Sequence, residues 1–138
     1  MEDIRSVLTK FPEKNKQDHK DSSHFDQVPT PTVSEIPDVF FDVVLTKLKL
    51  SRQEITTLMY LYRYTWCRPN LYRSHGIGPI HSYSEMSRDL FLSQDELIQI
   101  LRHLETLGLL QTIRAGQYFI RKYFIEELDL RYGQTYEF

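Results

Sequence analysis

The residues best suited to chemistry in this 138-residue sequence lie between positions 67 and 81. Cys67, His75 and His81 supply one thiol and two imidazoles, but they lack the paired spacing of a zinc site. The glycines at positions 76 and 78 are followed by Pro79 rather than by a helix, unlike a phosphate-binding loop. Neither order nor spacing suggests a Ser/His/Asp triad. We therefore expect a protein that is not an enzyme and that uses no metal, cofactor or small-molecule substrate.

Three serine–glutamate pairs predict where helices begin. They are Ser51 with Glu54, Ser82 with Glu85, and Ser93 with Glu96. In such a capping box the serine oxygen accepts a hydrogen bond from the backbone N–H three residues on, and the glutamate returns the bond. Apolar residues at helical spacing follow each pair. The middle helix must be short, because Ser93 comes eleven residues after Ser82, and Gly108 fits a left-handed cap at the end of the last helix.

The apolar pattern changes after Gly108 from helical to extended. Residues 110–113 and 117–124 are rich in β-branched and aromatic side chains, and they flank a hairpin turn at residues 114–116. Residues 78–81 could supply a short third strand. Upstream, Pro37 can open a helix over residues 38–47 as a first-turn proline. The predicted order of helix, helix, short strand, helix, turn, helix and hairpin is that of a winged helix-turn-helix domain.

A series of short motifs runs from Ile36 to about Ile120, which is about three-fifths of the chain. They are Ile36-Pro37-Asp38, Leu50-Ser51 with Glu54, Leu61-Tyr62-Arg63-Tyr64-Thr65-Trp66, Ser82-Tyr83-Ser84-Glu85-Met86, Leu92-Ser93, Leu97, Leu101, Leu104 and Gly108-Leu109-Leu110. In these motifs the sequence resembles the N-terminal winged helix domain of phage replication protein O and, more distantly, repressors of the multiple-antibiotic-resistance-regulator type. The resemblance implies an α+β, mostly helical winged helix-turn-helix fold with a C-terminal β-hairpin wing.

In the geometry of that family, the helix starting at Ser93 reads the major groove of DNA with its N-terminal residues leading. The side chains expected to face outward from this helix are Gln94, Asp95, Ile98, Gln99 and Arg102. Glutamine can pair with adenine and arginine with guanine. The wing residues expected to bind phosphates are Arg114, Arg121 and Lys122. The favoured hypothesis is therefore sequence-specific DNA binding, by a transcription regulator or an accessory factor in DNA replication.

Three residues depart from the family pattern. Phe91 stands where the turn between the two helices usually has glycine, and it requires either a different turn or a partner surface. Asp95 and Glu96 open the recognition helix, where the family more often has Arg, Asn or Thr. The helix dipole accounts for Asp95 and the capping box for Glu96. Both acids would nevertheless repel phosphate. Ile98 suits a protein contact better than a groove edge. The alternative hypothesis is a non-catalytic adaptor that binds another protein and not DNA.

Charge is segregated along the chain, although the net charge is only −2. Residues 47–73 have six basic residues against Glu54 alone, whereas residues 85–105 have two basic and five acidic residues. The basic residues either form a second basic surface or are spread around two helices and a loop. Tyr60, Leu61 and Tyr64 make the helix after Ser51 apolar on more than one face, which is compatible with a homodimer.

We expect three regions in the chain. Residues 1–35 are polar and contain several prolines, which predicts a flexible, disordered arm with a short helix over residues 3–11. Residues 36–125 form the winged helix domain, and residues 126–138 form an aromatic and acidic extension. Its last part, residues 132–138, either packs on the helix after Ser51 or docks a partner. The sequence has no secretory signal, no membrane-spanning stretch and a single Cys67, so we expect a cytoplasmic protein without disulfides that does not bind membranes.

Overall fold

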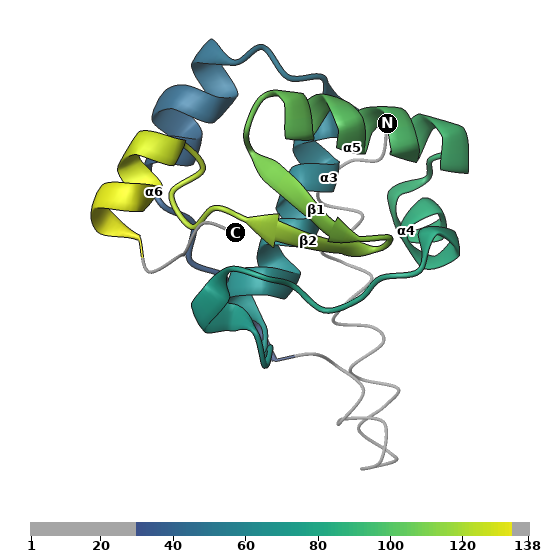
Figure 1. Cartoon of the computed structure of the whole chain (residues 1–138), viewed down its shortest axis with the longest axis horizontal. Coiled ribbons are helices and arrows are strands. Elements are labelled where there is room, and N and C mark those ends of the chain that lie inside the picture. Colours follow the sequence, from purple (N-terminus) through teal and green to yellow (C-terminus); the bar gives the residue numbers. More distant parts are fainter. Residues whose placement is uncertain (1–29, 134–138) are drawn as a thin grey trace, which may run out of the picture. The chain divides into compact units, whose positions relative to one another are not determined.

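The computed structural model describes residues 30–133 of the chain. This part is an α+β structure, mostly helical, in which the strands form a two-stranded antiparallel hairpin near the C-terminal end (Figure 1). The chain divides between Val33 and Ser34 into two units, and all the elements named below belong to the second unit. The helix predicted over residues 3–11 and residues 134–138 of the predicted extension lie outside the described residues.

The order of elements follows the predicted order. The elements are η1 (Phe40–Leu45), α3 (Arg52–Tyr62), η2 (Arg63–Cys67), η3 (Arg73–His75), α4 (Tyr83–Leu90), α5 (Gln94–Thr106), β1 (Leu110–Arg114), β2 (Gln117–Ile120) and α6 (Glu126–Tyr132). The turns η1 and η2 are π-helical, and η3 is a single 3-10 turn. This arrangement is compatible with a winged helix, in which a pair of helices precedes a hairpin.

The three predicted helix starts are confirmed. The Ser51 hydroxyl accepts from the Glu54 N–H at 3.1 Å, and the Glu54 carboxylate accepts from the Ser51 N–H at 2.8 Å. Ser93 and Glu96 form the same reciprocal pair at the start of α5, with distances of 3.1 and 3.3 Å. At Ser82 the structure shows the serine's half of the box, a 3.0 Å bond from the backbone N–H three residues on. Each cap stabilises its helix by about 1 kcal/mol.

The last helix of the pair, α5, ends at the predicted left-handed glycine. Gly108 has a φ of +78°, and its N–H bonds to the Glu105 carbonyl at 3.0 Å. The N–H of Leu109 then bonds to the Leu104 carbonyl at 3.1 Å, which closes a C-terminal cap of the Schellman type. This cap reverses the chain and carries Leu109 and Leu110 into the core, where both side chains are buried.

The predicted hairpin is confirmed, and its register places Leu110 opposite Ile120 and Thr112 opposite Tyr118. Its turn lies at Ala115 and Gly116, between the ends of β1 and β2.

Residues 77–81 run along β2, where the sequence predicted a third strand at residues 78–81. Ile77 forms a bridge with Phe119, and the N–H of Gly78 bonds to the Tyr118 carbonyl at 3.0 Å. The next bond, from His81 to the Gly116 carbonyl at 2.7 Å, is made after Pro79 has interrupted the ladder. The segment therefore pairs where predicted but does not form a regular strand.

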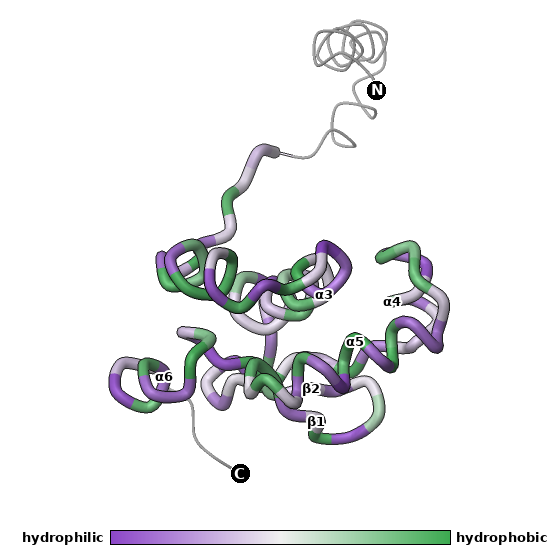
Figure 2. Tube along the Cα trace, turned by 90° about the horizontal axis from the view of Figure 1, so that it is seen from above, coloured by the Kyte–Doolittle hydropathy of each residue, from purple (hydrophilic) through white to green (hydrophobic). Residues whose placement is uncertain are grey.

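The core lies between α3, α5 and the hairpin, with α3 facing the hairpin in the view of Figure 2. Tyr62 donates its hydroxyl proton to the Lys122 carbonyl at 2.9 Å, and the indole N–H of Trp66 bonds to the Ile120 carbonyl at 3.0 Å. Leu58 and Leu61 are buried beside them. These contacts fix α3 and η2 to the C-terminal end of β2.

The broad apolar surface of α3 is used within the chain. Leu61 is buried in the core, and the rings of Tyr60 and Tyr64 lie 5.6 and 5.0 Å from the ring of His81. The Tyr60 hydroxyl also donates to Asp89 of α4 at 3.0 Å. The three residues that suggested a homodimer through this helix are therefore accounted for by intramolecular packing.

The first helix begins close to the predicted position, because the N–H of Phe40 bonds to the Pro37 carbonyl at 3.0 Å. Helical bonding covers the predicted residues 38–47, but its central part, Phe40–Leu45, is π-helical. Phe40 and Val44 face the core and are buried.

The prediction that the second strand reaches residue 124 is wrong, since β2 ends at Ile120. Phe124 adopts a left-handed φ of +63° and is completely buried, where it stacks on Tyr62 with ring centroids 4.7 Å apart. Burial of this ring favours a turn over continued pairing, and the turn leads into α6. In the described part of the chain, no helix is long and apolar enough to cross a membrane.

Candidate interaction surface at the turn between α4 and α5

The turn between α4 and α5 keeps the backbone conformation that usually requires glycine. Phe91 has φ +56° and ψ +44°, in the left-handed region, and its N–H bonds to the Ser87 carbonyl. Its side chain is 93% exposed, whereas the neighbouring Leu92 is buried in the core. Of the two explanations that the sequence left open for Phe91, a different turn is therefore excluded.

The turn and the Ser93 cap determine which side chains of α5 point away from the core. Gln94, Asp95, Gln99 and Arg102 are exposed, as predicted, while Ile98 is half-buried. The opposite face carries Leu97, Ile100, Leu101 and Leu104, all buried. The five predicted side chains of α5 thus share one face, which begins directly beside Phe91.

Acidic side chains predominate around this turn. Residues 85–96 contain four acids, Glu85, Asp89, Asp95 and Glu96, and a single base, Arg88. Arg88 forms an ion pair with Asp89, with Nε and Oδ1 3.2 Å apart. The surface that α4 and the first turn of α5 present is therefore negative.

Two interactions between elements hold α4 and α5 against α3. The Asp89 carboxylate accepts from the Tyr60 hydroxyl, and burial, assisted by this carboxylate, raises the pKa of Tyr60. His103 on α5 contacts the carboxylate of Glu54, the capping residue of α3. Burial opposes ionisation of Glu54, but the hydrogen bonds from His103 and Ser51 outweigh it and lower the pKa of Glu54. These links join both helices of the candidate surface to α3.

Of the three predicted wing residues, Arg114 alone lies at the hairpin turn. It is exposed, and its Nε donates to the Gln117 side chain at 3.0 Å. The turn itself is packed against the chain, because His81 bonds to Gly116 and a side chain at position 116 would collide with the His81 carbonyl. The hairpin therefore does not project freely from the domain.

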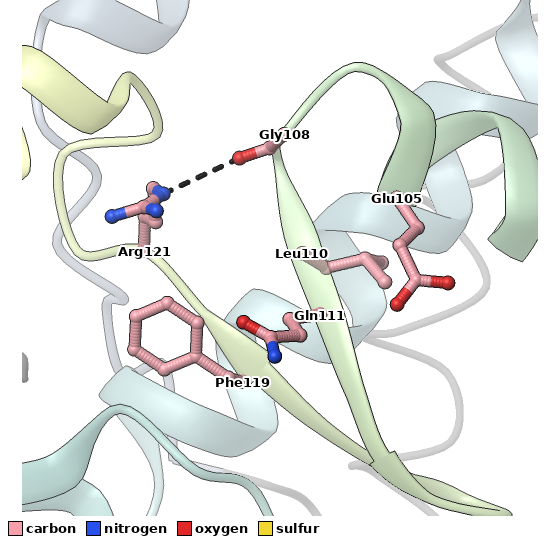
Figure 3. Close-up of a pocket in the computed structure, with 6 residues that line it drawn as sticks. All are labelled: Glu105, Gly108, Leu110, Gln111, Phe119 and Arg121. Carbon is pink, nitrogen blue, oxygen red and sulfur yellow. Dashed lines mark hydrogen bonds between the residues drawn. The ribbon is translucent and has the colours of Figure 1, made fainter. Parts of the chain in front are cut away.

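Arg121 lies at the opposite end of β2 and is engaged inside the chain. Its side chain is 12% exposed, with Nη1 3.6 Å from the fully buried Asp129 and Nη2 3.8 Å from Glu126. Its Nε donates to the Gly108 carbonyl at 3.3 Å (Figure 3). The structure thus uses this charge to hold α6, and the prediction that Arg121 is available to bind phosphate does not fit this placement.

Lys122, the third predicted wing residue, is half-buried. Its Nζ lies 5.7 Å from the Trp66 ring centroid and 5.8 Å from that of Tyr123, within the range of cation–π attraction. Like Arg121, it follows the end of β2 and does not lie at the hairpin turn.

A hollow of about 320 Å³ opens between the end of α5 and the hairpin (Figure 3). It is lined by Glu105, Gly108, Leu110, Gln111, Phe119 and Arg121. The Glu105 carboxylate already accepts from the Thr112 N–H at 2.9 Å, and Arg121 is paired with α6. Both charged side chains of the hollow, Glu105 and Arg121, therefore already have partners within the chain.

Fold and site together define a class: a small, mostly helical α+β domain whose helix pair exposes an acidic surface with an apolar centre. No family model matches the chain, nor does any characterised protein or solved structure, so the comparisons assign it to no family.

Proposed function

We propose that this chain is a winged helix that serves as a non-catalytic protein-interaction module. Its docking surface consists of Phe91, Gln94, Asp95 and Ile98, the residues of the α4–α5 turn and of the adjoining face of α5. The observation that carries the proposal is Phe91, which combines a left-handed backbone with a side chain that is 93% exposed.

The energetics of Phe91 favour a role outside the fold. A residue with a Cβ in the left-handed region costs about 1–2 kcal/mol, which glycine would avoid. An apolar side chain offsets such a cost only by burial, as Phe124 does elsewhere in this domain. Phe91 is exposed, so the fold gains little from its ring. Strain without benefit to stability is typical of positions kept for binding.

The charges around Phe91 define the partner. An acidic rim with an aromatic centre matches a partner that offers an exposed apolar surface bordered by Lys or Arg. Ile98 and Gln94 extend this surface along α5, since residues four apart lie on one helix face.

DNA binding is the second candidate, and one observation favours it: Gln94, Gln99 and Arg102 are exposed on one face of α5, as base readout requires. Asp95 on the same face repels phosphate, and the Arg121 charge is paired with Asp129. Arg114 is therefore the predicted wing residue that is best placed to contact DNA.

Two measurements separate the candidates. In fluorescence anisotropy with duplex DNA fragments over a salt series, we expect no salt-dependent binding by the wild type and none by Asp95→Asn. DNA binding that Asp95→Asn strengthens and salt weakens would support the second candidate instead.

The second measurement uses the full chain as bait. We expect a partner protein, once purified, to bind the wild type and Tyr132→Ser equally, because Tyr132 is an exposed aromatic residue remote from the turn in sequence. Phe91→Gly should lose this binding. Equal binding by wild type and Phe91→Gly would refute the proposed surface.

A further inference from the structure

Phe91 and Leu71 are the most exposed large apolar side chains among the described residues from Ser34 onward, each 93% exposed. They lie in segments of opposite charge. Residues 85–96 around Phe91 carry four acids and one base, whereas residues 63–84 around Leu71 carry three arginines and no acid. This pairing of exposed apolar centres with opposite charges makes the two surfaces complementary.

The loop that carries Leu71 is held by hydrogen bonds from the Asn70 side chain. The side-chain N–H groups of Asn70 donate to the carbonyls of Thr65 at 3.2 Å and Ile77 at 2.7 Å, which closes the base of the loop. The Asn70 side-chain oxygen accepts from the Tyr72 N–H at 3.3 Å. Leu71 is therefore held outward by a structured turn, so little conformational entropy is lost when it is buried against another surface.

Basic side chains border this loop. Arg68 and Arg73 flank Leu71 and are exposed, as is Arg63 at the start of η2. Tyr72 adds a half-exposed aromatic ring beside Leu71. We name the surface of Arg68, Leu71, Tyr72 and Arg73 the basic loop.

The two surfaces cannot contact each other within one chain. The segment around η3, in teal at the lower left of Figure 1, lies across the domain from the α4–α5 turn at the right edge. α4 is also at the edge of the domain in the view of Figure 2. Complementary surfaces on opposite sides of one molecule favour a head-to-tail contact between copies.

We propose that the partner of the Phe91 docking surface is the basic loop of a second copy of this chain. Phe91 and Leu71 bury each other's exposed apolar surface, and Asp95 with its acidic neighbours faces Arg68 and Arg73. Because the contact joins two different surfaces, a bound pair of copies still has one free docking surface and one free basic loop, so assembly continues beyond two chains. This inference rests on the proposed function, since it names the partner of the same surface.

The test is sedimentation velocity on the full chain. For the wild type at low salt, the sedimentation coefficient should rise with concentration up to roughly 1 mM, the range of a weak contact, and fall back in high salt, which screens the ion pairs. Phe91→Gly and Leu71→Ser should each remain monomeric at all concentrations. Both substitutions remove exposed side chains, and thermal unfolding verifies that each variant is folded.

The decisive sample is an equimolar mixture of the two variants. Phe91→Gly keeps an intact basic loop and Leu71→Ser keeps an intact Phe91 surface, so the mixture should form dimers and stop there. A contact between identical surfaces would give no such complementation. A wild type that stays monomeric, a Leu71→Ser variant that still assembles, or a mixture that stays monomeric would overturn the head-to-tail contact.

Failure of this inference can be told apart from failure of the proposed function. If the wild type is monomeric but binds a different purified protein that Phe91→Gly does not bind, the surface is correct and the second copy is the wrong partner. If Phe91→Gly changes neither self-association nor partner binding, both proposals fail.

Discussion

Replacing Phe91 by glycine should make the domain more stable than replacing it by alanine, which is the opposite of the usual order in helices. Alanine retains the Cβ and with it the left-handed strain of about 1–2 kcal/mol. Glycine relieves that strain but adds about 0.4–1 kcal/mol of conformational entropy to the unfolded chain. Both lose the same small packing contribution of the ring, about 0.2 kcal/mol, because the side chain is 93% exposed.

At the centre of both ranges, the difference leaves about 0.8 kcal/mol in favour of Phe91→Gly over Phe91→Ala. For a domain of this size, that corresponds to a melting temperature about 2–6 °C higher, which differential scanning calorimetry resolves. The matched control is Ser87 on α4, a half-buried helical position, where alanine should be more stable than glycine. Should Phe91→Gly melt below Phe91→Ala, the strain argument for a binding role would be refuted.

The remaining predictions concern parts of the domain outside that turn. Ser93→Ala should lower the free energy of unfolding by about 1 kcal/mol in urea titrations, and Glu96→Ala by less, because both halves of the cap are present; no change would contradict the capping role. Arg121→Ala should lower the free energy of unfolding, by on the order of 3 kcal/mol, because it removes the guanidinium beside the buried Asp129 carboxylate, and a loss under about 0.5 kcal/mol would show that the pair is dispensable. Burial lowers the pKa of His81 below its ordinary value of 6.5. As the pH falls, the unfolded state therefore binds a proton at His81 before the folded state does. The contribution of neutral His81 to stability is complete above pH 6.5 and declines as the pH falls toward the pKa of the folded state. His81→Gln should flatten this part of the stability profile, and an unchanged slope would exclude His81 as the titrating group.

Local signals in the sequence predicted much of this fold. The serine–glutamate pairs and Gly108 act over a single helical turn, so their chemistry does not depend on distant parts of the chain. The sequence mispredicts the end of β2 because Tyr123 and Phe124 are aromatic, and strands favour aromatic residues. What ends the strand is the burial of Phe124 against Tyr62, a contact across sixty-two positions that no local pattern reveals.

The candidate site was predictable to a similar extent. Helical periodicity placed the outward residues of α5, and the usual glycine position drew attention to Phe91. The ion pair between Arg121 and Asp129 was not predictable. The sequence near a hairpin does not distinguish a basic residue that binds phosphate from one that pairs with a buried carboxylate. Leu71 was missed because nothing in the sequence shows that Asn70 orders its loop and turns Leu71 outward.

Some charged side chains of this domain make contacts within the fold, and others are free to bind a partner. Arg121 holds α6 to the hairpin, Lys122 lies against Trp66, and His103 contacts Glu54, so these basic groups are engaged within the domain. Phe91, with its left-handed backbone, and Leu71 are each 93% exposed, and they lie in segments of opposite charge. A binding function has to draw on groups that the fold does not require. On that criterion, protein association through these two surfaces accounts for more of the structure than major-groove readout by α5.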